Sequence, residues 1–325
     1  MGEKDDMTNE YVGQNERFAD LCNYVLFDGE PIIQADALER RDVLELAGVF
    51  GVDEKQIHYQ RKWRDLLKHA VIKYTGEAFI VLLGVENQTN VHYAMPVRNM
   101  LYDALNYSAQ VKDADKKHRV AKEHKSDAEF LSGFHKDDRL TPVITITLYW
   151  GNDAWDAPRT LHEMFLEVDE QLKCFLPDYV MNLVVPSEIP DFEKFHTELG
   201  DVLAAIKASG NESSMAQLLE ENSHFSKLDN ESIRIINKFI NTDIPMNQEE
   251  GVTDVCKAWD DHLERGRREG RREGRAEGRT EGRTEGKREV LVSLVNDGLL
   301  ALSEAAKRAG LSDKDFEKLL GASNI

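Results

Sequence analysis

Two strand-like runs separated by a tight turn constrain the fold more than any other feature of the sequence. The runs are Trp63–Ile72 and Ala78–Gln88, and the segment Tyr74-Thr75-Gly76-Glu77 lies between them. Glycine adopts the left-handed conformation that a two-residue hairpin turn requires, so Thr75-Gly76 is the predicted turn. The pattern predicts an antiparallel β-hairpin, and the position of the turn decides which residues of the two strands face each other.

The register of this hairpin places two acidic side chains opposite each other. With Thr75-Gly76 as the turn, Asp65 faces Glu86, and directly opposed side chains have Cβ atoms about 4.5–5.5 Å apart. Two carboxylates at this separation repel each other unless a cation lies between them. Gln88 shares the face of Glu86, because successive side chains of a strand point to opposite faces.

This arrangement predicts a metal site. Asp65 and Glu86 are the expected ligands of a hard divalent cation, and Gln88 is the residue expected to orient a water beside it. Mg²⁺ is the first candidate and Mn²⁺ the alternative, since Mg²⁺ takes one or two carboxylates and keeps several waters. Such an ion stabilises the charge on a phosphodiester and activates the attacking water. The competing interpretation is a solvated hairpin with ordinary polar ends, because a turn shifted by one residue moves Asp65 to the other face.

Helices and strands are expected along the rest of the chain. Apolar spacing predicts a helix over residues 15–27, and Pro96 suits the first turn of a helix that runs to about Val111. The charged stretch Lys112–Lys136 is expected to form a loop with a short helix. The remaining predicted elements are strands over Val143–Trp150 and Val180–Val185 and helices over residues 192–240.

The composition changes abruptly near the carboxyl end. Residues 266–289 read GRREGRREGRAEGRTEGRTEGKRE, a tetrapeptide repeated six times. Glycine costs roughly 1 kcal/mol relative to alanine inside a helix, so we expect a flexible linker or a long solvated helix, with self-association as the other interpretation. Val290–Leu320 is expected to form three short helices, with Ser303 and Ser312 as N-caps and Gly310 as a C-terminal stop.

The net charge limits how the chain can contact nucleic acid. A formal charge of −19 excludes binding through the whole surface, so contact with DNA requires a local basic patch. Arg61, Lys62 and Arg64 lie beside Asp65 and are the expected phosphate contacts. A second basic cluster, interleaved with acids, is the alternative: Lys112, Lys116, Lys117, Arg119, Lys122 and Lys125.

Other sequence features bear on the compartment. The three cysteines, Cys22, Cys174 and Cys256, support neither a zinc site nor a disulfide framework. No apolar run is long enough to span a membrane, and the acidic start of the chain is unlike a signal peptide. We therefore expect a cytoplasmic protein with no membrane partner.

Several separate segments carry a family resemblance. RDLLKH, LLGVENQ and VHYAMPVRNMLYDALNY follow one another between Trp63 and Tyr107, and NERFADLCN, TPVITITLYWGNDAWDAPRTLHEMF and the GRxEG repeat agree as well. Over roughly residues 10 to 325 the chain resembles the Rpn family of recombination-promoting nucleases and putative transposases, within the PD-(D/E)XK nuclease superfamily. The resemblance implies a restriction-endonuclease-like α/β fold, a mixed sheet flanked by helices, and Mg²⁺-dependent cleavage of DNA.

The resemblance also assigns roles to individual residues. Asp65 matches the first acid of the motif and Glu86 the second. Gln88 stands at the position where the superfamily has a lysine, and the resembled family is similar to this chain in having glutamine there. An acid from the first helix often joins such sites, and both Glu16 and Asp20 are candidates. Arg98, one turn into the following helix, is expected either to contact phosphate or the site carboxylates or to form a structural ion pair.

Four regions and two functional hypotheses follow. We expect a nuclease-like core over residues 10–190, a helical extension over 191–262, the repeat as linker or helix over 263–289, and a small helical module over 290–325. The first hypothesis is a Mg²⁺-dependent DNA endonuclease whose partner is DNA. The second is a catalytically weak or inactive nuclease-fold scaffold that assembles through its C-terminal tail, as a homo-oligomer held by the repeat.

Overall fold

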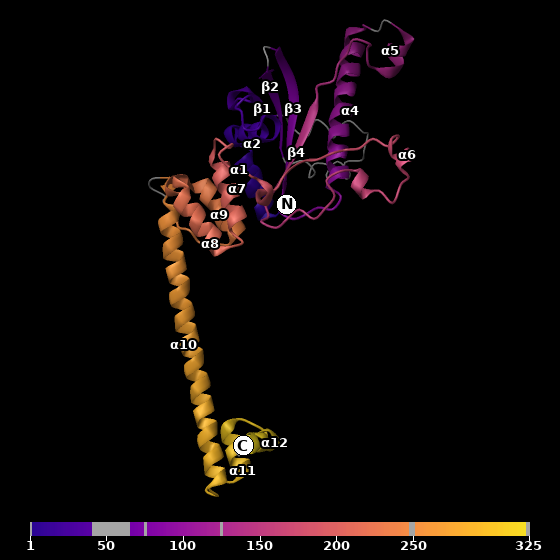
Figure 1. Ribbon diagram of the computed structural model, residues 1–325. Helices are drawn as coiled ribbons and strands as arrows, with labels where there is room; N and C mark the ends of the chain where they lie inside the picture. Colours follow the sequence, from indigo (N-terminus) through magenta and orange to yellow (C-terminus); the bar gives the residue numbers. More distant parts are fainter. Residues whose placement is uncertain (1, 41–65, 75–76, 124–125, 247–250, 323–325) are drawn as a thin grey trace. The chain divides into compact units, whose positions relative to one another are not determined.

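The computed structural model describes residues 2–40, 66–74, 77–123, 126–246 and 251–322 (Figure 1). The chain divides into two compact units, Met1–Lys257 and Ala258–Ile325, and each is considered by itself. Within the described part of the chain, no helix combines the length and the apolar composition needed to cross a membrane.

The first unit is built on a mixed five-stranded sheet with the order β1-β2-β3-β4-β5. Strands β1 to β3 are antiparallel, whereas β3, β4 and β5 run parallel. Their bounds are Leu38–Arg40, Leu66–Tyr74, Glu77–Gln88, Val143–Tyr149 and Asn182–Val184. A mixed sheet flanked by helices confirms the predicted α/β class.

The register of the predicted hairpin is confirmed along the described residues. Tyr74 pairs with Glu77 next to the turn, and the same register continues to the pair Leu66 and Val85. The turn residues Thr75-Gly76 and the residue Asp65 lie outside the described part of the chain. The described pairs therefore have the predicted register as far as Leu66 and Val85. The next pair, Asp65 with Glu86, stays a prediction.

Helices cover both faces of the sheet (Figure 1). Helix α4 (Met95–Ala121) packs on one face, where Tyr107 contacts the apolar cluster Leu67, Leu82 and Val143. Helices α1 (Glu3–Val12) and α2 (Asn15–Phe27) lie on the other face. There Lys68 donates hydrogen bonds to the carbonyl of Gly13 and to Asn15, each at 2.6 Å.

Helix α4 is longer than predicted. It continues past Val111 to Ala121, so the first part of the charged stretch is helix and not loop. Oppositely charged residues four apart stabilise such a helix, and Arg119 donates to Asp115 at 2.6 Å. The short helix expected in this stretch is α5 (Asp127–Ser132). Helix α1 is not predicted from the sequence, because its residues are mostly polar, although Thr8, Tyr11 and Val12 are buried.

Further short elements complete the first unit. Three helices form the predicted helical region: α7 (Glu198–Ala208), α8 (Glu212–Glu221) and α9 (Asn230–Ile240). The two-residue strands β6 (Leu228–Asp229) and β7 (Val252–Thr253) pair beside them. The remaining short helices are α6 (Glu170–Lys173) and 3₁₀ turns at Ala35–Ala37, His162–Met164, Pro186–Glu188 and Ser223–Lys227.

The GRxE repeat is helical. Helix α10 runs from Val255 to Asn296 and includes all six tetrapeptides. Helices α11 (Leu302–Ala309) and α12 (Asp313–Ala322) follow, and a small apolar core forms from Leu291, Val292, Ala305, Ala306 and Phe316. Gly310 ends α11 in a left-handed conformation, as predicted. Ser303 is not its N-cap, because the N-cap is Ala301 and the helix begins at Leu302.

Candidate active site

Glu86 and Gln88 lie at the carboxyl end of β3, on the face that α4 covers. Glu86 pairs with Thr147 of β4 and Gln88 pairs with Tyr149. Both side chains are buried, Glu86 completely and Gln88 to 8% exposure. Asn87 between them points to the opposite face, where its amide donates to Asn9 of α1 at 2.7 Å. The predicted alternation of the two faces is therefore present at this point of the strand.

Arg98 compensates the charge of the buried carboxylate. Its Nη2 lies 3.3 Å from Oε2 of Glu86, and its Nε donates to the hydroxyl of Tyr102 at 2.6 Å. Pro96 in the first turn of α4 starts the helix immediately before this residue. Arg98 therefore forms an ion pair with Glu86, which agrees both with an arginine that holds a site carboxylate and with a structural ion pair. The attraction within a buried ion pair offsets the free energy of desolvating its charges only when additional hydrogen bonds of this kind are present.

A ladder of buried hydrogen bonds ties α4 to β4. Asn99 donates to Thr147 Oγ1 at 2.8 Å, and Thr145 donates to Asp103 Oδ1 at 2.6 Å. The second oxygen of Asp103 accepts from the hydroxyl of Tyr179 at 2.6 Å. Residues four apart on a helix and two apart on a strand each share one face, so these rungs set the position of α4 beside Glu86.

This ladder is not predicted from the sequence. Its signal is the spacing of small polar side chains: threonines two apart on β4 opposite an amide and an acid four apart on α4. Either pattern alone is typical of solvent-facing positions. Only the parallel pairing of β3 with β4 brings Thr147 beside Glu86 and shows that the pattern is buried.

The donor set at this end of α4 suits a hard cation. Carboxylate and amide oxygens are the ligands that Mg²⁺ and Ca²⁺ take in proteins, and Glu86, Gln88 and Asn99 supply them here. Asn99 is fully buried, and the described residues provide no hydrogen-bond partner for its Oδ1. A buried polar atom left in this state costs about 1–3 kcal/mol. A cation with its bound waters would satisfy it, so the residues present fit a hydrated Mg²⁺.

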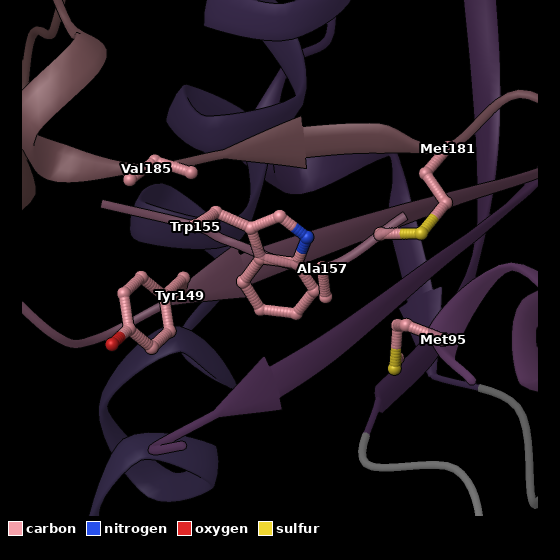
Figure 2. Close-up of a cluster of buried hydrophobic side chains, with 6 residues drawn as sticks. All are labelled: Met95, Tyr149, Trp155, Ala157, Met181 and Val185. Atoms are coloured by element: carbon pink, nitrogen blue, oxygen red, sulfur yellow. The ribbon is translucent and has the colours of Figure 1, made fainter. Parts of the chain in front are cut away.

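An apolar cluster forms around Tyr149, at the end of β4 (Figure 2). It consists of Met95, Tyr149, Trp155, Ala157, Met181 and Val185. The rings of Tyr149 and Trp155 meet edge to face, with centroids 5.4 Å apart. Because Tyr149 pairs directly with Gln88, this packing keeps water away from one side of the site and strengthens charge interactions there.

The remaining predicted site residues divide into two groups. Asp65, together with Arg61, Lys62 and Arg64, lies outside the described residues. Of the two helix candidates, Asp20 is buried and its carboxylate accepts from the backbone N–H groups of His196 and Thr197 at 2.9 Å. Asp20 therefore supports the start of α7.

The other helix candidate, Glu16, is exposed. Its helix, α2, packs on the face of the sheet opposite α4, as the contact of Asn15 with Lys68 shows. The described residues thus bring neither Glu16 nor Asp20 to Glu86. The alternative basic cluster lies on α4 and its side chains are exposed from Lys112 to Lys122, while Lys125 is outside the described residues.

Comparison with known proteins gives one family match. Residues 54–232, more than half of the chain, match a family model described as "Putative transposase, YhgA-like". The matched range covers β2, β3, α4 and β4, and so includes Glu86, Gln88 and Arg98. Searches among curated proteins and among solved structures found no match.

Proposed function

Because the chain belongs to the YhgA-like family of putative transposases, we propose that it is a metal-dependent DNA endonuclease of the PD-(D/E)XK type. The family description supports chemistry on DNA. The observation that carries the proposal is the hairpin register, in which Leu66 pairs with Val85. Asp65 precedes Leu66 in the chain and Glu86 follows Val85, so a continued register sets the two acids opposite each other.

Each residue of the site has a separate task in this proposal. Asp65 and Glu86 hold Mg²⁺ or Mn²⁺, which supplies stabilisation of the charge that develops on the scissile phosphate. The amide oxygen of Gln88 accepts a hydrogen bond from the attacking water and sets its direction. Arg98 fixes the orientation of the Glu86 carboxylate through Oε2. The basic residues beside Asp65 bind the phosphates of the DNA backbone.

A plasmid-nicking assay tests the proposal. Purified protein should nick supercoiled DNA with Mg²⁺ or Mn²⁺ and not with EDTA, and Asp65→Asn should lose this activity. Glu16→Gln is the matched control, because it removes an exposed carboxylate from the opposite face of the sheet. Equal nicking by wild type and Asp65→Asn would identify a contaminating nuclease and remove the proposal.

One observation favours a second function, a non-catalytic scaffold. The buried carboxylate of Glu86 already has the guanidinium of Arg98 beside it, and Gln88 adds no charge of its own. The repeat on α10 presents its arginine and glutamate side chains to solvent from Arg271 to Glu285, where they can pair with a second copy. Calorimetry separates the two functions: no heat with millimolar Mg²⁺ or Mn²⁺, together with no nicking, supports the scaffold. Light scattering across protein concentrations then measures self-association.

A further inference from the structure

Two histidines and an aspartate converge at the carboxyl end of α4. His118 lies in the last turn of the helix, and His135 and Asp138 lie in the segment after α5. One ligand atom from each side chain falls within 4.8 Å of the others. His118 Nε2 is 2.9 Å from Asp138 Oδ2 and 3.2 Å from Oδ1. At a rise of 1.5 Å per residue, this cluster is roughly 30 Å along α4 from Arg98.

The local fold holds the three residues in place. Ser126 caps the start of α5 by accepting from the N–H of Glu129 at 3.2 Å. Gly133 ends α5 with a φ of +68°, and a Cβ at this position would lie 2.6 Å from the carboxyl carbon of Asp115 on α4. The segment therefore packs tightly against α4 (Figure 1). Asp138 Oδ2 also accepts from the N–H of His135 at 2.7 Å, which fixes the ligands on the segment relative to each other.

The spacing of the side chains is close to that of a tetrahedral metal site. With bonds of about 2.0–2.1 Å to zinc, neighbouring ligand atoms of a tetrahedron lie about 3.4 Å apart. The His118–Asp138 edge, at 2.9 Å to Oδ2 and 3.2 Å to Oδ1, is slightly shorter than this separation. The two imidazole rings stack with centroids 3.4 Å apart and planes 17° from parallel, and the third ligand atom lies within 4.8 Å of the other two.

The electrostatic surroundings favour a cation at this position. Helix α4 ends at Ala121, and the carboxyl end of a helix carries the negative pole of its dipole. His135 is 8% exposed and His118 is half-buried, which limits the number of waters that a metal would keep.

We propose that His118, His135 and Asp138 bind a divalent transition metal, with Zn²⁺ as the expected ion and water as its fourth ligand. Imidazole nitrogens suit zinc, nickel and copper, whereas the all-oxygen donor set beside Arg98 suits magnesium. The metal joins the end of α4 to the segment after α5 and so stabilises this part of the unit. This site does not depend on the nuclease proposal, because none of its residues belongs to that centre.

Metal binding by the full-length protein tests the site. After removal of metal with EDTA, equilibrium dialysis and native mass spectrometry should find one Zn²⁺ per chain. His118→Ala, His135→Ala and Asp138→Asn should each weaken binding by at least about 100-fold, since even indirect partners of a ligand change metal affinity by 10–100-fold. His162→Ala is the matched control, because His162 is also paired with an aspartate, Asp178, but its ring lies tilted against Phe165 with no second histidine beside it among the ring contacts of the described residues.

A second measurement on the unaltered chain guards against variants that fail to fold. Co²⁺ added to the metal-free protein should give the visible absorption of a tetrahedral site, and Zn²⁺ should abolish it. Folded wild-type protein that binds neither ion, or triad variants that bind zinc as wild type does, would overturn the proposal. Plasmid nicking on the same preparations tests the nuclease proposal separately. Protein that does not bind zinc but still nicks DNA would contradict the zinc site and leave the nuclease proposal intact.

Discussion

The two ends of helix α4 hold charged side chains in different ways. At the amino end, the fully buried carboxylate of Glu86 forms an ion pair with the guanidinium of Arg98. At the carboxyl end, the carboxylate of Asp138 contacts the imidazole of His118, on which the ring of His135 stacks, and is partly exposed. The side chains at the start of the helix are thus a carboxylate and a guanidinium, whereas those at its end are a carboxylate and two imidazoles.

This difference bears on the ions that we propose for the two ends. A guanidinium keeps its charge at every physiological pH, so Glu86 is compensated permanently and a metal there must add to an existing ion pair. An imidazole is neutral near pH 7 and then offers a lone pair to a metal. The comparison predicts a hard cation with retained waters at the amino end and a borderline transition metal at the carboxyl end.

The largest expected effect is on DNA cleavage. Glu86→Gln removes a proposed metal ligand and should lower plasmid nicking by at least about 100-fold, the upper range for weaker perturbations of a metal site. His162→Ala, which changes a histidine outside both sites, should leave nicking unchanged. Nicking by Glu86→Gln at the wild-type rate would assign the amino end of α4 a structural role alone.

The next effect is on stability and contrasts two arginines of the same helix. Arg98→Met leaves the buried carboxylate of Glu86 without its guanidinium and should lower the free energy of unfolding by about 3 kcal/mol. Arg119→Met removes an exposed pair with Asp115 and should cost at most about 0.5 kcal/mol. Urea unfolding measures both. Equal losses of unfolding free energy in the two variants would show that burial does not distinguish the two ion pairs. Adding Glu86→Gln to Arg98→Met should restore part of the unfolding free energy, because it removes the unpaired charge.

A smaller effect concerns the acid that supports α7. Asp20 accepts two backbone N–H groups and the hydroxyl of Thr197, so Asp20→Asn should cost about 2 kcal/mol of unfolding free energy. Nicking per folded molecule should stay at the wild-type level. If Asp20→Asn unfolds as wild type does but no longer nicks DNA, Asp20 belongs to the active site. The assignment of Asp20 to the support of α7 would then be wrong.

The smallest effect is on the pH dependence of the unfolding free energy, through His92, which lies just before the amino end of α4. Burial, and then the charge of Arg98, lower the pKa of His92 below its ordinary value of 6.5, and its Nδ1 accepts from the N–H of Ala94 at 3.3 Å. The unfolded chain therefore takes up the proton first, and the stability that neutral His92 contributes is lost as the pH falls below 6.5. His92→Asn should flatten this part of the curve of unfolding free energy against pH. An unchanged slope would contradict the assignment.

The parts of the fold that the sequence predicted depend on local rules. The hairpin register follows from one glycine in a two-residue turn and the period of two in a strand, and it is present from Tyr74–Glu77 to Leu66–Val85. Helix α2 was predicted over its observed residues for the same reason, because its apolar side chains recur at helical spacing. Asp65 remains a prediction, since it lies outside the described residues.

The parts that were missed depend on tertiary contacts. Asn99 and Asp103 look like solvent-facing positions until the parallel strand β4 brings Thr147 and Thr145 beneath them. The end of α4 was placed too early because charge alone does not distinguish a solvated helix from a loop. The role of Arg98 was left open, since its partner Glu86 is separated from it by a loop whose path the sequence does not specify.

A crystal structure of the protein soaked in Mn²⁺ tests the central claim most directly. The anomalous scattering of Mn²⁺ marks the ion independently of the protein atoms. We predict one peak between the carboxylates of Asp65 and Glu86, within bonding distance of both and with Gln88 beside a bound water. Carboxylates that point to opposite faces of the sheet, with no ion at Glu86, would contradict the claim.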